Sequence, residues 1–517
     1  MPPGEETIGV VGAGTMGIGI AETALLRGYS ATVVDSSAEA IENARGRIES
    51  SFARAVERGR CGGPEAEAAL ENLELGDDLG PLVGCDAVIE AVSERLEVKQ
   101  RLFDGLLEAC RPATLLATNT SSLRVSTIAA GTADPARIVG MHFFNPVPRM
   151  ELVEVIPGIA TEPDVTARAR RLGEGLGKRV IVARDGIGFL VNRAGRPFVG
   201  EALRLVQEQV ATPEQVDRVC RLGGGFRMGP FELADLIGND VNLEITESFW
   251  FQSYGEPRWR PSHIQRGLVD AGRLGRKSGI GFYDYSGESH RAPDPEVPMT
   301  GGGEGRRVAI LGAGQVAVGL RERSAAAGFP VDDGDPTGAA AWLTLDARTD
   351  RGAGDQDGAG PRAILCAGSS LTGAGYPAAS GFHLIGPTEE SRLVELTRLA
   401  STDPTCFERT VEYFVALGYL TEEVGDAPGL VLGRIVSQLV NEAAFMIGEG
   451  LARPSDIDTG ATFGLNYPRG PVAWAAAAGL DHIRAVLGGL EAARGEERYR
   501  PAPLFDGEPA ELGQLPG

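Results

Sequence analysis

The chain is poor in positive charge, in histidine and in closely spaced cysteine. Its 49 lysine and arginine residues are outnumbered by 71 aspartate and glutamate residues, and the net charge is −22. Nucleic-acid-binding proteins normally carry a basic face, so we expect no nucleic-acid partner. The six cysteines are scattered, which argues against a zinc site and against a disulfide framework. We therefore expect no metal, and reduced thiols in a cytoplasmic protein.

Long apolar runs are also missing. No segment approaches the roughly 18 consecutive apolar residues of a membrane helix, and the first residues show no basic stretch followed by an apolar one. We expect neither a membrane partner nor a secretory signal. A chain of 517 residues that is 43% hydrophobic is long enough to form several domains with cores of their own.

The first residues alternate between strand and helix patterns. Residues 8–11 and 31–34 are short apolar runs typical of buried strands, and residues 18–26 between them have helical spacing. This unit predicts a parallel sheet with a right-handed crossover. The later expected elements are a long helix over 38–60, strands at 87–92, 115–118, 138–141 and 152–156, and helices throughout 190–255.

A glycine-rich turn joins the first strand to the first helix. Gly12, Gly14 and Gly17 fit the pattern G-x-G-x-x-G, in which the glycines allow a tight turn, close approach of a pyrophosphate, and helix–strand packing. The N–H groups at the start of the helix would face the phosphates. We expect the turn, including Thr15 and Met16, to bind a dinucleotide.

Asp35 ends the second expected strand, 23 residues after Gly12. A carboxylate at this place accepts hydrogen bonds from ribose hydroxyls and repels a 2′-phosphate, so it predicts NAD rather than NADP. The alternative is a structural glycine turn followed by a surface aspartate.

His142 is the candidate base for hydride transfer from an alcohol. Histidine suits this role because its ordinary pKa of about 6.5 lies close to neutral pH. His142 follows the expected strand 138–141, at the sheet edge where ligands bind. Glu154 lies on the next strand and could accept a hydrogen bond from the imidazole, and Ser121 could face the same crevice. The alternative is a histidine buried for structural reasons.

One segment of this acidic chain is locally basic. It contains Arg45, Arg47, Arg54, Arg58 and Arg60, and Arg54 and Arg58 share a helix face. The cluster is either a solvated helix face or a docking site for a phosphate-bearing substrate.

The pattern of the first half recurs after a linker rich in glycine, proline and glutamate. A second glycine turn at Gly312 lies 300 residues after the first, whereas His383 and Glu395 lie 241 residues after His142 and Glu154. The chain is therefore an internal duplication that has lost about 59 residues between the second turn and its histidine. We expect this copy to be degenerate and to bind no cofactor.

Several longer motifs resemble the 3-hydroxyacyl-CoA dehydrogenase family, and the likeness covers residues 7–285. They are Asn119–Leu123, His142–Pro148, Gly188–Arg193 and Met228–Leu233. The second half is similar to the longer bacterial members, the 3-hydroxybutyryl-CoA and 3-hydroxyadipyl-CoA dehydrogenases of phenylacetate degradation. That likeness rests on Leu465–Pro471 and Gly495–Pro501.

The resemblance implies the catalytic roles. His142 would be the general base and Glu154 its partner. Ser121 and Asn192 would hydrogen-bond the reacting oxygen at C3 of the substrate.

The resemblance also implies ligand contacts. Glu94, Lys99 and Asn145 match positions near the nicotinamide-ribose end of NAD. Ser51 and Arg58 match residues that contact coenzyme A, which favours the docking interpretation of the arginine cluster.

The second copy departs from this pattern. Leu432 stands at the place of Asn192, and Gly386 at the place of Asn145. We expect His383 and Glu395 to be a relic pair held by packing.

The predicted fold is α/β, with a Rossmann-type doubly wound sheet domain, an all-helical domain, and a degenerate tandem copy of both. The helical domains are expected to form a homodimer or to pack on each other within one chain. The expected segments are a dinucleotide-binding domain at 1–185, a helical domain at 186–285, a linker at 286–305, a truncated sheet domain at 306–426, a second helical domain at 427–505 and a tail at 506–517.

The predicted reaction is the reversible conversion of a (3S)-3-hydroxyacyl-CoA and NAD⁺ into a 3-oxoacyl-CoA, NADH and a proton. Short-chain, dicarboxylic and longer acyl groups all stay open. Two other functions stay open as well, an NAD-linked dehydrogenase of a hydroxy acid without coenzyme A and a non-catalytic nucleotide-binding protein.

Overall fold

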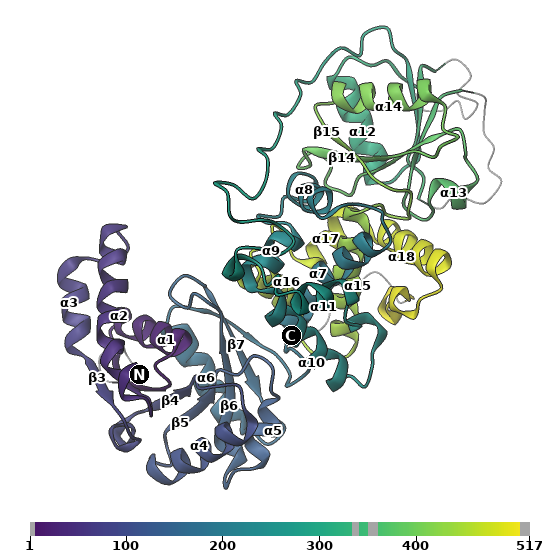
Figure 1. The fold of residues 1–517 in the computed structure, drawn as a ribbon. Coiled ribbons are helices and arrows are strands. Elements are labelled where there is room, and N and C mark those ends of the chain that lie inside the picture. The colour runs from purple at the N-terminus through teal and green to yellow at the C-terminus, as the bar shows by residue number, and fades with distance from the viewer. Residues whose placement is uncertain (1–5, 333–340, 350–359, 507–517) are drawn as a thin grey trace. The chain divides into compact units, whose positions relative to one another are not determined.

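The computed structural model describes residues 6–332, 341–349 and 360–506. It divides into two compact units (Figure 1). The first holds residues 1–193 with 463–465, and the second holds 194–462 with 466–517. The expected tail lies outside the described residues from 507 onward.

The first unit is built on one eight-stranded sheet with the order β3-β2-β1-β4-β5-β6-β7-β8. β7 runs antiparallel to β6, and every other neighbouring pair is parallel. The strand order reverses between β1 and β4, which creates the crevice where ligands bind in such sheets. The strands are β1 (Thr7–Val11), β2 (Ser30–Val34), β3 (Leu73–Gly76), β4 (Ala87–Glu90), β5 (Leu115–Thr118), β6 (Ile138–Phe143), β7 (Leu152–Pro157) and β8 (Arg179–Val182).

Helices cover both faces of this sheet, so its central strands are apolar on both sides. α1, α2, α3 and α6 share one apolar core with the strands, and α4 and α5 share the other. The helices are α1 (Thr15–Leu26), α2 (Ala38–Glu57), α3 (Gly63–Glu71), α4 (Leu96–Ala109), α5 (Val125–Ala130) and α6 (Pro163–Gly175). In the described part of the chain, no helix is both long and apolar enough to cross a membrane.

The second unit contains a seven-stranded sheet with the order β10-β9-β11-β12-β13-β14-β15, again with one antiparallel pair, β13 and β14. It follows the order of the first sheet without an equivalent of β3. The strands are β9 (Val308–Leu311), β10 (Val331–Asp332), β11 (Leu343–Asp346), β12 (Arg362–Leu365), β13 (Ser380–His383), β14 (Leu393–Thr397) and β15 (Leu420–Glu423). Its helices are α12 (Gln315–Ala326), α13 (Leu371–Ala374) and α14 (Pro404–Ala416).

The truncation of this second copy has a definite place. Only residues 333–342 separate β10 from β11, whereas α2, α3 and β3 lie between the matching strands β2 and β4. Ten residues cannot hold a helix of 20 residues such as α2, so this segment accounts for most of the loss.

The helical domain also occurs twice within the second unit, and matching helices begin 241 residues apart. The first set is α7 (Val191–Gln207), α8 (Pro213–Gly224), α9 (Pro230–Ile237), α10 (Asn239–Gln252) and α11 (His263–Asp270). The second set is α15 (Leu432–Gly448), α16 (Pro454–Gly464), α17 (Pro471–Ala478) and α18 (Leu480–Arg494). The fold class predicted from the sequence, including the tandem copy, is confirmed.

A buried ion pair joins the two helical copies. Arg434 on α15 donates to Glu201 on α7 through Nη2 at 2.6 Å and Nε at 2.9 Å, and both side chains are fully buried. Tyr499 donates to the same carboxylate at 3.1 Å. Burial alone would raise the pKa of Glu201, but Arg434 and Arg498 lower it. Because a lone buried charge is costly, this pair fixes how α7 and α15 meet.

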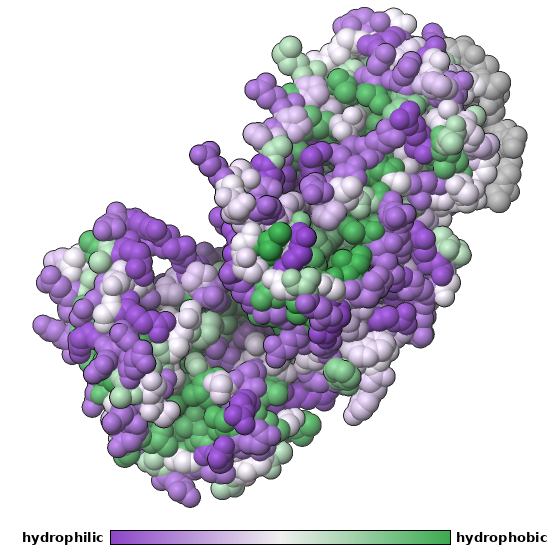
Figure 2. All heavy atoms as spheres, viewed as in Figure 1, coloured by the Kyte–Doolittle hydropathy of each residue, from purple (hydrophilic) through white to green (hydrophobic). Residues whose placement is uncertain are grey.

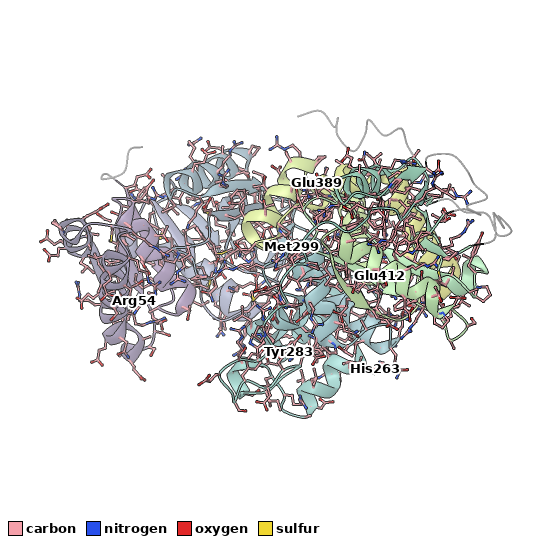
Figure 3. All side chains as sticks on the ribbon, turned by 90° about the horizontal axis from the view of Figure 1, so that it is seen from above. Arg54, His263, Tyr283, Met299, Glu389 and Glu412 are labelled. Atoms are coloured by element: carbon pink, nitrogen blue, oxygen red, sulfur yellow. The ribbon has the colours of Figure 1, made fainter. Side chains whose placement is uncertain are left out.

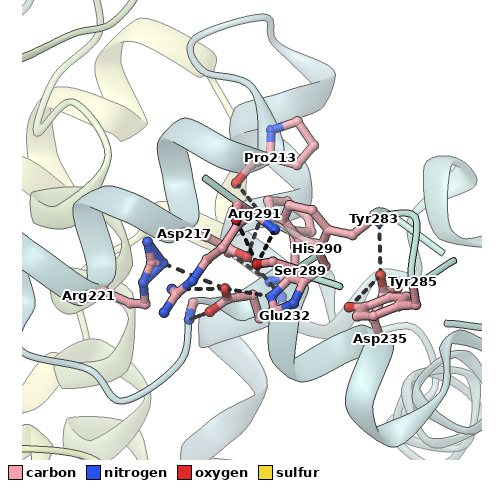
Figure 4. A network of polar contacts seen from close by, with 12 residues as sticks. Pro213, Asp217, Arg221, Glu232, Asp235, Tyr283, Tyr285, Ser289, His290 and Arg291 are labelled. Atoms are coloured by element: carbon pink, nitrogen blue, oxygen red, sulfur yellow. Dashed lines mark hydrogen bonds and ion pairs between the residues drawn. The ribbon is translucent and has the colours of Figure 1, made fainter. Parts of the chain in front are cut away.

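A second buried network ties the linker to the first helical copy (Figure 4). Glu232 binds His290 and Arg291 of the expected linker, each at 3.0 Å. Asp217 accepts hydrogen bonds from the amides of Phe231 and Glu232 and from the Tyr283 hydroxyl, at 2.7–2.9 Å. The first part of the linker is therefore held against the helical domain.

The buried Asp217 predicts a pH-dependent stability. Burial raises its pKa from 3.8 to about 7, against the opposing effect of the donors that face it. The folded chain thus binds a proton at Asp217 more tightly than the unfolded chain does. The free energy of unfolding should therefore fall as the pH rises from 3.8 to about 7. This pKa shift corresponds to a loss of unfolding free energy on the order of 4 kcal/mol at most.

Urea unfolding of the wild type and Asp217→Asn between about pH 5 and pH 8 checks this expectation. The variant cannot ionise here, so the fall in stability with pH should be smaller. Asp270→Asn, at an exposed position on α11, serves as the control and should keep the wild-type slope. An unchanged slope in Asp217→Asn would contradict the assignment.

Candidate active site

The glycine turn between β1 and α1 has the geometry of a phosphate cradle. Gly12 has a φ of +109°, and a Cβ there would lie 2.6 Å from the Ala91 carbonyl oxygen. A Cβ on Gly17 would lie 1.8 Å from the Gly12 carbonyl oxygen. A Cβ on Gly14 would meet nothing within 4 Å. The first and third glycines are thus required by packing, and the second leaves backbone open to a ligand, so the turn fits a dinucleotide pyrophosphate.

Asp35 lies beside this turn. Its carboxylate accepts hydrogen bonds from the Ala13 amide at 2.8 Å and from the Ser37 amide at 2.9 Å. Thr15 is exposed at the start of α1 and Met16 is half-buried. The predicted ribose acceptor therefore stands at the edge of the predicted pyrophosphate site.

His142 and Glu154 face each other across β6 and β7, where they are register partners. His142 Nδ1 lies 2.6 Å from Glu154 Oε2. The other carboxylate oxygen of Glu154 accepts the amides of Leu190 and Val191, each at 3.0 Å, at the beginning of α7. Glu154 is fully buried, and His142 is 6% exposed.

Two aromatic rings pack near the imidazole. The ring centroid of His142 lies 4.5 Å from that of Phe144 and 5.9 Å from that of Phe189. Since Nδ1 faces the carboxylate, Nε2 is the ring nitrogen left to face a substrate.

Glu94 organises the loop that carries Ser121. One oxygen of Glu94 accepts hydrogen bonds from the Thr120 hydroxyl at 2.5 Å and from the Ser121 and Ser122 amides at 2.9 and 3.0 Å. Burial alone would raise the pKa of Glu94, but Lys99 and these donors lower it. Ser121 is exposed, and its carbonyl oxygen accepts a 3.4 Å hydrogen bond from Asn192 Nδ2.

Lys99 lies deeper than a direct cofactor contact requires. Its side chain is 1% exposed and its Nζ lies 2.5 Å from Glu90 and 3.2 Å from Glu94. Glu90 also accepts the Thr118 hydroxyl at 2.7 Å. Glu90 is not among the residues expected from the sequence, although a carboxylate at the end of the apolar strand β4 is a visible signal.

A basic cavity of about 930 Å³ adjoins α1 and α2 in the first unit. Cationic side chains that line it are Arg27, Arg47, Arg54, Arg58, Arg60, Arg149 and Lys178. Asn145 and Ser51 line it too, and Ser51 donates to Glu22 at 2.5 Å. Figure 2 shows hydrophilic residues gathered over α2 and α3, and Figure 3 labels Arg54.

Arg45 does not share in this cavity. It donates to the Leu73 carbonyl oxygen at 3.3 Å, so it tethers α2 to β3. The arginine cluster thus divides into four residues that line the cavity and Arg45, which does not.

The second copy keeps the carboxylate and its two amide donors, but its histidine has a different partner. Glu395 accepts the amides of Val431 and Leu432 at 2.6 and 3.0 Å, as Glu154 does at α7. The His383 imidazole, however, pairs through Nε2 with His482 at 3.1 Å, and its Nδ1 has no hydrogen-bond partner among the described residues. The expected relic pair is therefore adjacent in the sheet but not hydrogen-bonded. Burial raises the pKa of Glu395 to about 8, against the opposing amides.

Comparison with known protein families assigns both halves of the chain. Residues 7–186 match the model of the 3-hydroxyacyl-CoA dehydrogenase NAD-binding domain. Residues 188–285 and 429–512 both match the model of the C-terminal domain of that family. The chain belongs to the 3-hydroxyacyl-CoA dehydrogenase family.

Individual relatives agree with this assignment. The chain is 37% identical over 500 residues to a 3-hydroxyadipyl-CoA dehydrogenase of Escherichia coli, covering 97% of this chain and 96% of that protein. It is 42% identical over 276 residues to a probable 3-hydroxybutyryl-CoA dehydrogenase of Bacillus subtilis, covering 53% of this chain and 96% of that protein.

A solved structure of an Escherichia coli 3-hydroxybutyryl-CoA dehydrogenase matches with a TM-score of 0.82 and 35% identity, covering 97% of both chains. The predicted enzyme class, an NAD-dependent 3-hydroxyacyl-CoA dehydrogenase, is confirmed.

Replacing Glu154 by glutamine should impair turnover. The amide removes the charge that fixes the imidazole, so we expect kcat to fall by a factor on the order of 10² to 10⁴, as for other carboxylates that orient a histidine base. NADH formation or consumption with an acyl-CoA substrate measures this.

Glu151→Gln, at an exposed position just before β7, is the matched control and should keep wild-type kcat. NADH affinity should be unchanged in both variants. Wild-type kcat in Glu154→Gln would show that the carboxylate does not support the base.

Proposed function

We propose that the chain oxidises (3S)-3-hydroxyacyl-CoA with His142 as the general base and Glu154 as its positioning partner. The observation that carries this proposal is the 2.6 Å contact between His142 Nδ1 and Glu154 Oε2, in the same unit as the glycine turn. Glu154 also accepts two backbone amides, so it acts as an acceptor only. Nδ1 therefore carries the proton, and Nε2 takes the proton of the substrate hydroxyl.

The charge that this transfer creates is held within the protein. The imidazolium formed at His142 is stabilised by the buried carboxylate, since the pair is shielded from water. Ser121 and Asn192 supply donors for the C3 oxygen, which bears the developing charge in the reductive direction. Their 3.4 Å contact supports a shared position beside the substrate.

NAD⁺ would supply the hydride acceptor. Gly12, Gly14, Thr15, Met16 and Gly17 would hold its pyrophosphate. Asp35 would accept the adenosine-ribose hydroxyls. We assign Glu94 and Asn145 to the nicotinamide-ribose end, and Lys99 to positioning Glu94, because its ammonium is buried against that carboxylate.

Coenzyme A would dock at the basic cavity. Ser51 and Arg58 line it, and an excess of arginine suits phosphate groups. For the acyl group, we propose a dicarboxylic, adipyl-type chain with 3-hydroxybutyryl-CoA as a second substrate, on the strength of the names of the relatives.

We further propose that the two helical copies form an intrachain pseudo-dimer in place of a homodimer. The buried pair of Arg434 and Glu201 supports this, because it occupies the contact between α7 and α15. A cytoplasmic location is also proposed, in keeping with six cysteines that are free in the structure.

His142→Gln tests the base assignment. Loss of a general base should lower kcat by a factor on the order of 10² to 10⁴, while NADH binding, followed by fluorescence, should stay at the wild-type level. Near-normal turnover would show that another group takes the proton.

The same assays separate the remaining functions. The wild type should turn over 3-hydroxybutyryl-CoA and leave free 3-hydroxybutyrate unreacted. Preference for the free acid would favour a dehydrogenase that does not use coenzyme A. NADH binding without turnover of any acyl-CoA would favour a non-catalytic protein.

Arg58→Leu tests the docking of coenzyme A. Loss of one exposed charge facing a phosphate should raise KM for an acyl-CoA by about three- to tenfold and leave kcat unchanged. The matching acyl-pantetheine, which lacks the phosphates, should show no change in KM.

Arg45→Leu removes the same charge from the same helix outside the cavity and should leave KM for the acyl-CoA unchanged. An equal rise of KM in Arg58→Leu for the acyl-CoA and for the acyl-pantetheine would show that the phosphates of coenzyme A bind elsewhere.

A further inference from the structure

A cavity of about 1040 Å³ lies in the second copy, wholly within the second compact unit. It is lined by the carboxyl ends of β9, β11 and β12, by the start of α12 and by one face of α18. The strand order of this sheet reverses between β9 and β11, so the cavity occupies the place where ligands bind in doubly wound sheets. Small-molecule sites measure about 300–1,000 Å³, so the cavity is large enough for a nucleotide.

The glycine turn at this cavity keeps the backbone of the first turn. Gly312 has the same φ as Gly12, +109°. Gly314 is the N-cap of α12 with φ −70° and ψ 173°, and Gly14 precedes α1 with φ −71° and ψ −172°. A Cβ on either N-cap glycine would meet nothing within 4 Å. The backbone at the start of α12 is therefore as open to a ligand as that at the start of α1.

The changes that make the second copy look degenerate do not concern this turn. Ala317 replaces the third glycine and is fully buried, but that position serves helix–strand packing and tolerates alanine. The counterparts of Asn192 and Asn145 are changed as well. Those two residues are proposed contacts of the reacting oxygen and the nicotinamide ribose, and neither is proposed to contact a pyrophosphate.

His482 gives the cavity a buried polar group. It lies in the first turn of α18, lines the cavity and is 4% exposed. Its Nε2 lies 3.1 Å from His383 Nε2, whereas its Nδ1 has no hydrogen-bond partner in the described part of the chain. Burial lowers the pKa of His482 to about 4, so the ring is uncharged near neutral pH and carries one proton.

The environment of His383 indicates which nitrogen of His482 carries that proton. Nδ1 of His383 is buried and lacks a hydrogen-bond partner among residues that the structure describes. An N–H buried without an acceptor is rarer than an unpaired acceptor, which favours a His383 that donates through Nε2 to His482. Nδ1 of His482 then carries the N–H, and this donor suits a phosphate oxygen in the cavity.

The arginines of the cavity do not supply its attraction for an anion. Arg348 is paired with Asp346 at 2.9 Å, and Arg484 is engaged within the protein as well. Asp481 lines the cavity in the first turn of α18 and offsets part of the field of that helix. The first turn of α12 holds no acidic residue, so its N–H groups and helix dipole are where an anion would bind.

We propose that this cavity is a second nucleotide site, which holds the pyrophosphate of a nucleoside diphosphate or of NAD(H) at the start of α12, with His482 Nδ1 as a further donor. A pyrophosphate alone is far smaller than 1040 Å³, so the cavity has room for the nucleoside. The site binds without hydride transfer, since the His383 imidazole is hydrogen-bonded to His482 and not to a carboxylate. It does not depend on the function proposed for the first copy.

Gly14→Asp and Gly314→Asp block the two turns separately. Each variant places a carboxylate at a helix N-cap, where it accepts the N–H groups that would face a phosphate and repels the phosphate charge. Aspartate is a favoured N-cap residue and a Cβ has room at both positions, so both variants should fold. Unfolding midpoints check this.

Isothermal titration calorimetry with NADH and with ADP counts the sites. The wild type should bind two equivalents of nucleotide. Gly14→Asp should bind one equivalent and lose turnover of an acyl-CoA, whereas Gly314→Asp should bind one equivalent and keep wild-type kcat. Residual binding of both NADH and ADP by Gly14→Asp would identify the nucleoside diphosphate part as the recognised group, and binding of NADH alone would identify the dinucleotide.

The residual site of Gly14→Asp is the background for the second set of variants. Adding Gly314→Asp should raise its Kd by about 10- to 100-fold, the range for hydrogen bonds to a charged group. Adding His482→Leu should raise it by about three- to tenfold, since one neutral donor is lost. Adding Gly287→Asp, which places the same charge at an exposed linker position of the same unit, should leave it unchanged.

Three results would overturn the proposal: a Gly14→Asp variant that binds neither NADH nor ADP at millimolar concentration, a residual site that Gly314→Asp does not weaken, or binding of inorganic pyrophosphate without binding of either nucleotide. All three are measured as binding and leave the oxidation of acyl-CoA untouched. Wild-type turnover in Gly14→Asp would instead contradict the cofactor turn assigned to the first copy.

Discussion

The buried carboxylate of Glu154 is the interaction on which the site depends. It joins three parts of the first unit: β7, which carries it, β6 through His142, and the beginning of α7 through the amides of Leu190 and Val191. The same side chain therefore places the imidazole and fixes where α7 begins. Because α7 carries Asn192, the proposed donor and the proposed base receive their positions from one residue. A buried charge is tolerated here because three donors surround it.

The duplication separates the two roles of this carboxylate. In the second copy Glu395 holds the start of α15 through the same two amides, yet the imidazole of His383 has turned to His482. The contact that holds the start of the helix is thus kept without a hydrogen bond to the histidine. Without the imidazole as a donor, burial prevails and the pKa of Glu395 rises to about 8. The amide contacts of this carboxylate are thus a structural feature of the fold that both copies share, whereas its contact with an imidazole occurs in the first copy.

Much of the fold follows from the sequence because its central strands are buried on both faces. The expected strand 115–118 is β5 as observed, and the expected 31–34 differs from β2 by one residue. The edge strands β3 and β8 escape prediction, since they are short, partly exposed and carry polar residues. The expected helical region 190–255 is divided by tight turns, and α8 begins at a Thr212 capping box.

The site residues also differ in how far the sequence predicts them: some follow from local spacing, and others depend on residues distant in the chain. His142 and Glu154 lie at adjacent strand ends, so spacing alone predicts their pairing, and Gly12 and Gly17 follow from a local turn. Burial depth depends on distant neighbours, so the sequence does not show that Glu90 and Glu94 enclose Lys99.

The cleft lined by Arg196, Thr246 and Arg498 lies beyond any local pattern. Arg196 comes from α7, Thr246 from α10, and Arg498 from the second copy, about 300 residues further along the chain. The helices of the duplicated domain must first pack on each other before these side chains share one surface. The second copy thus contributes to the first through packing. A duplicated half whose histidine pairs with another histidine, and that lacks the segment matching α2, α3 and β3, still shapes the environment of α7.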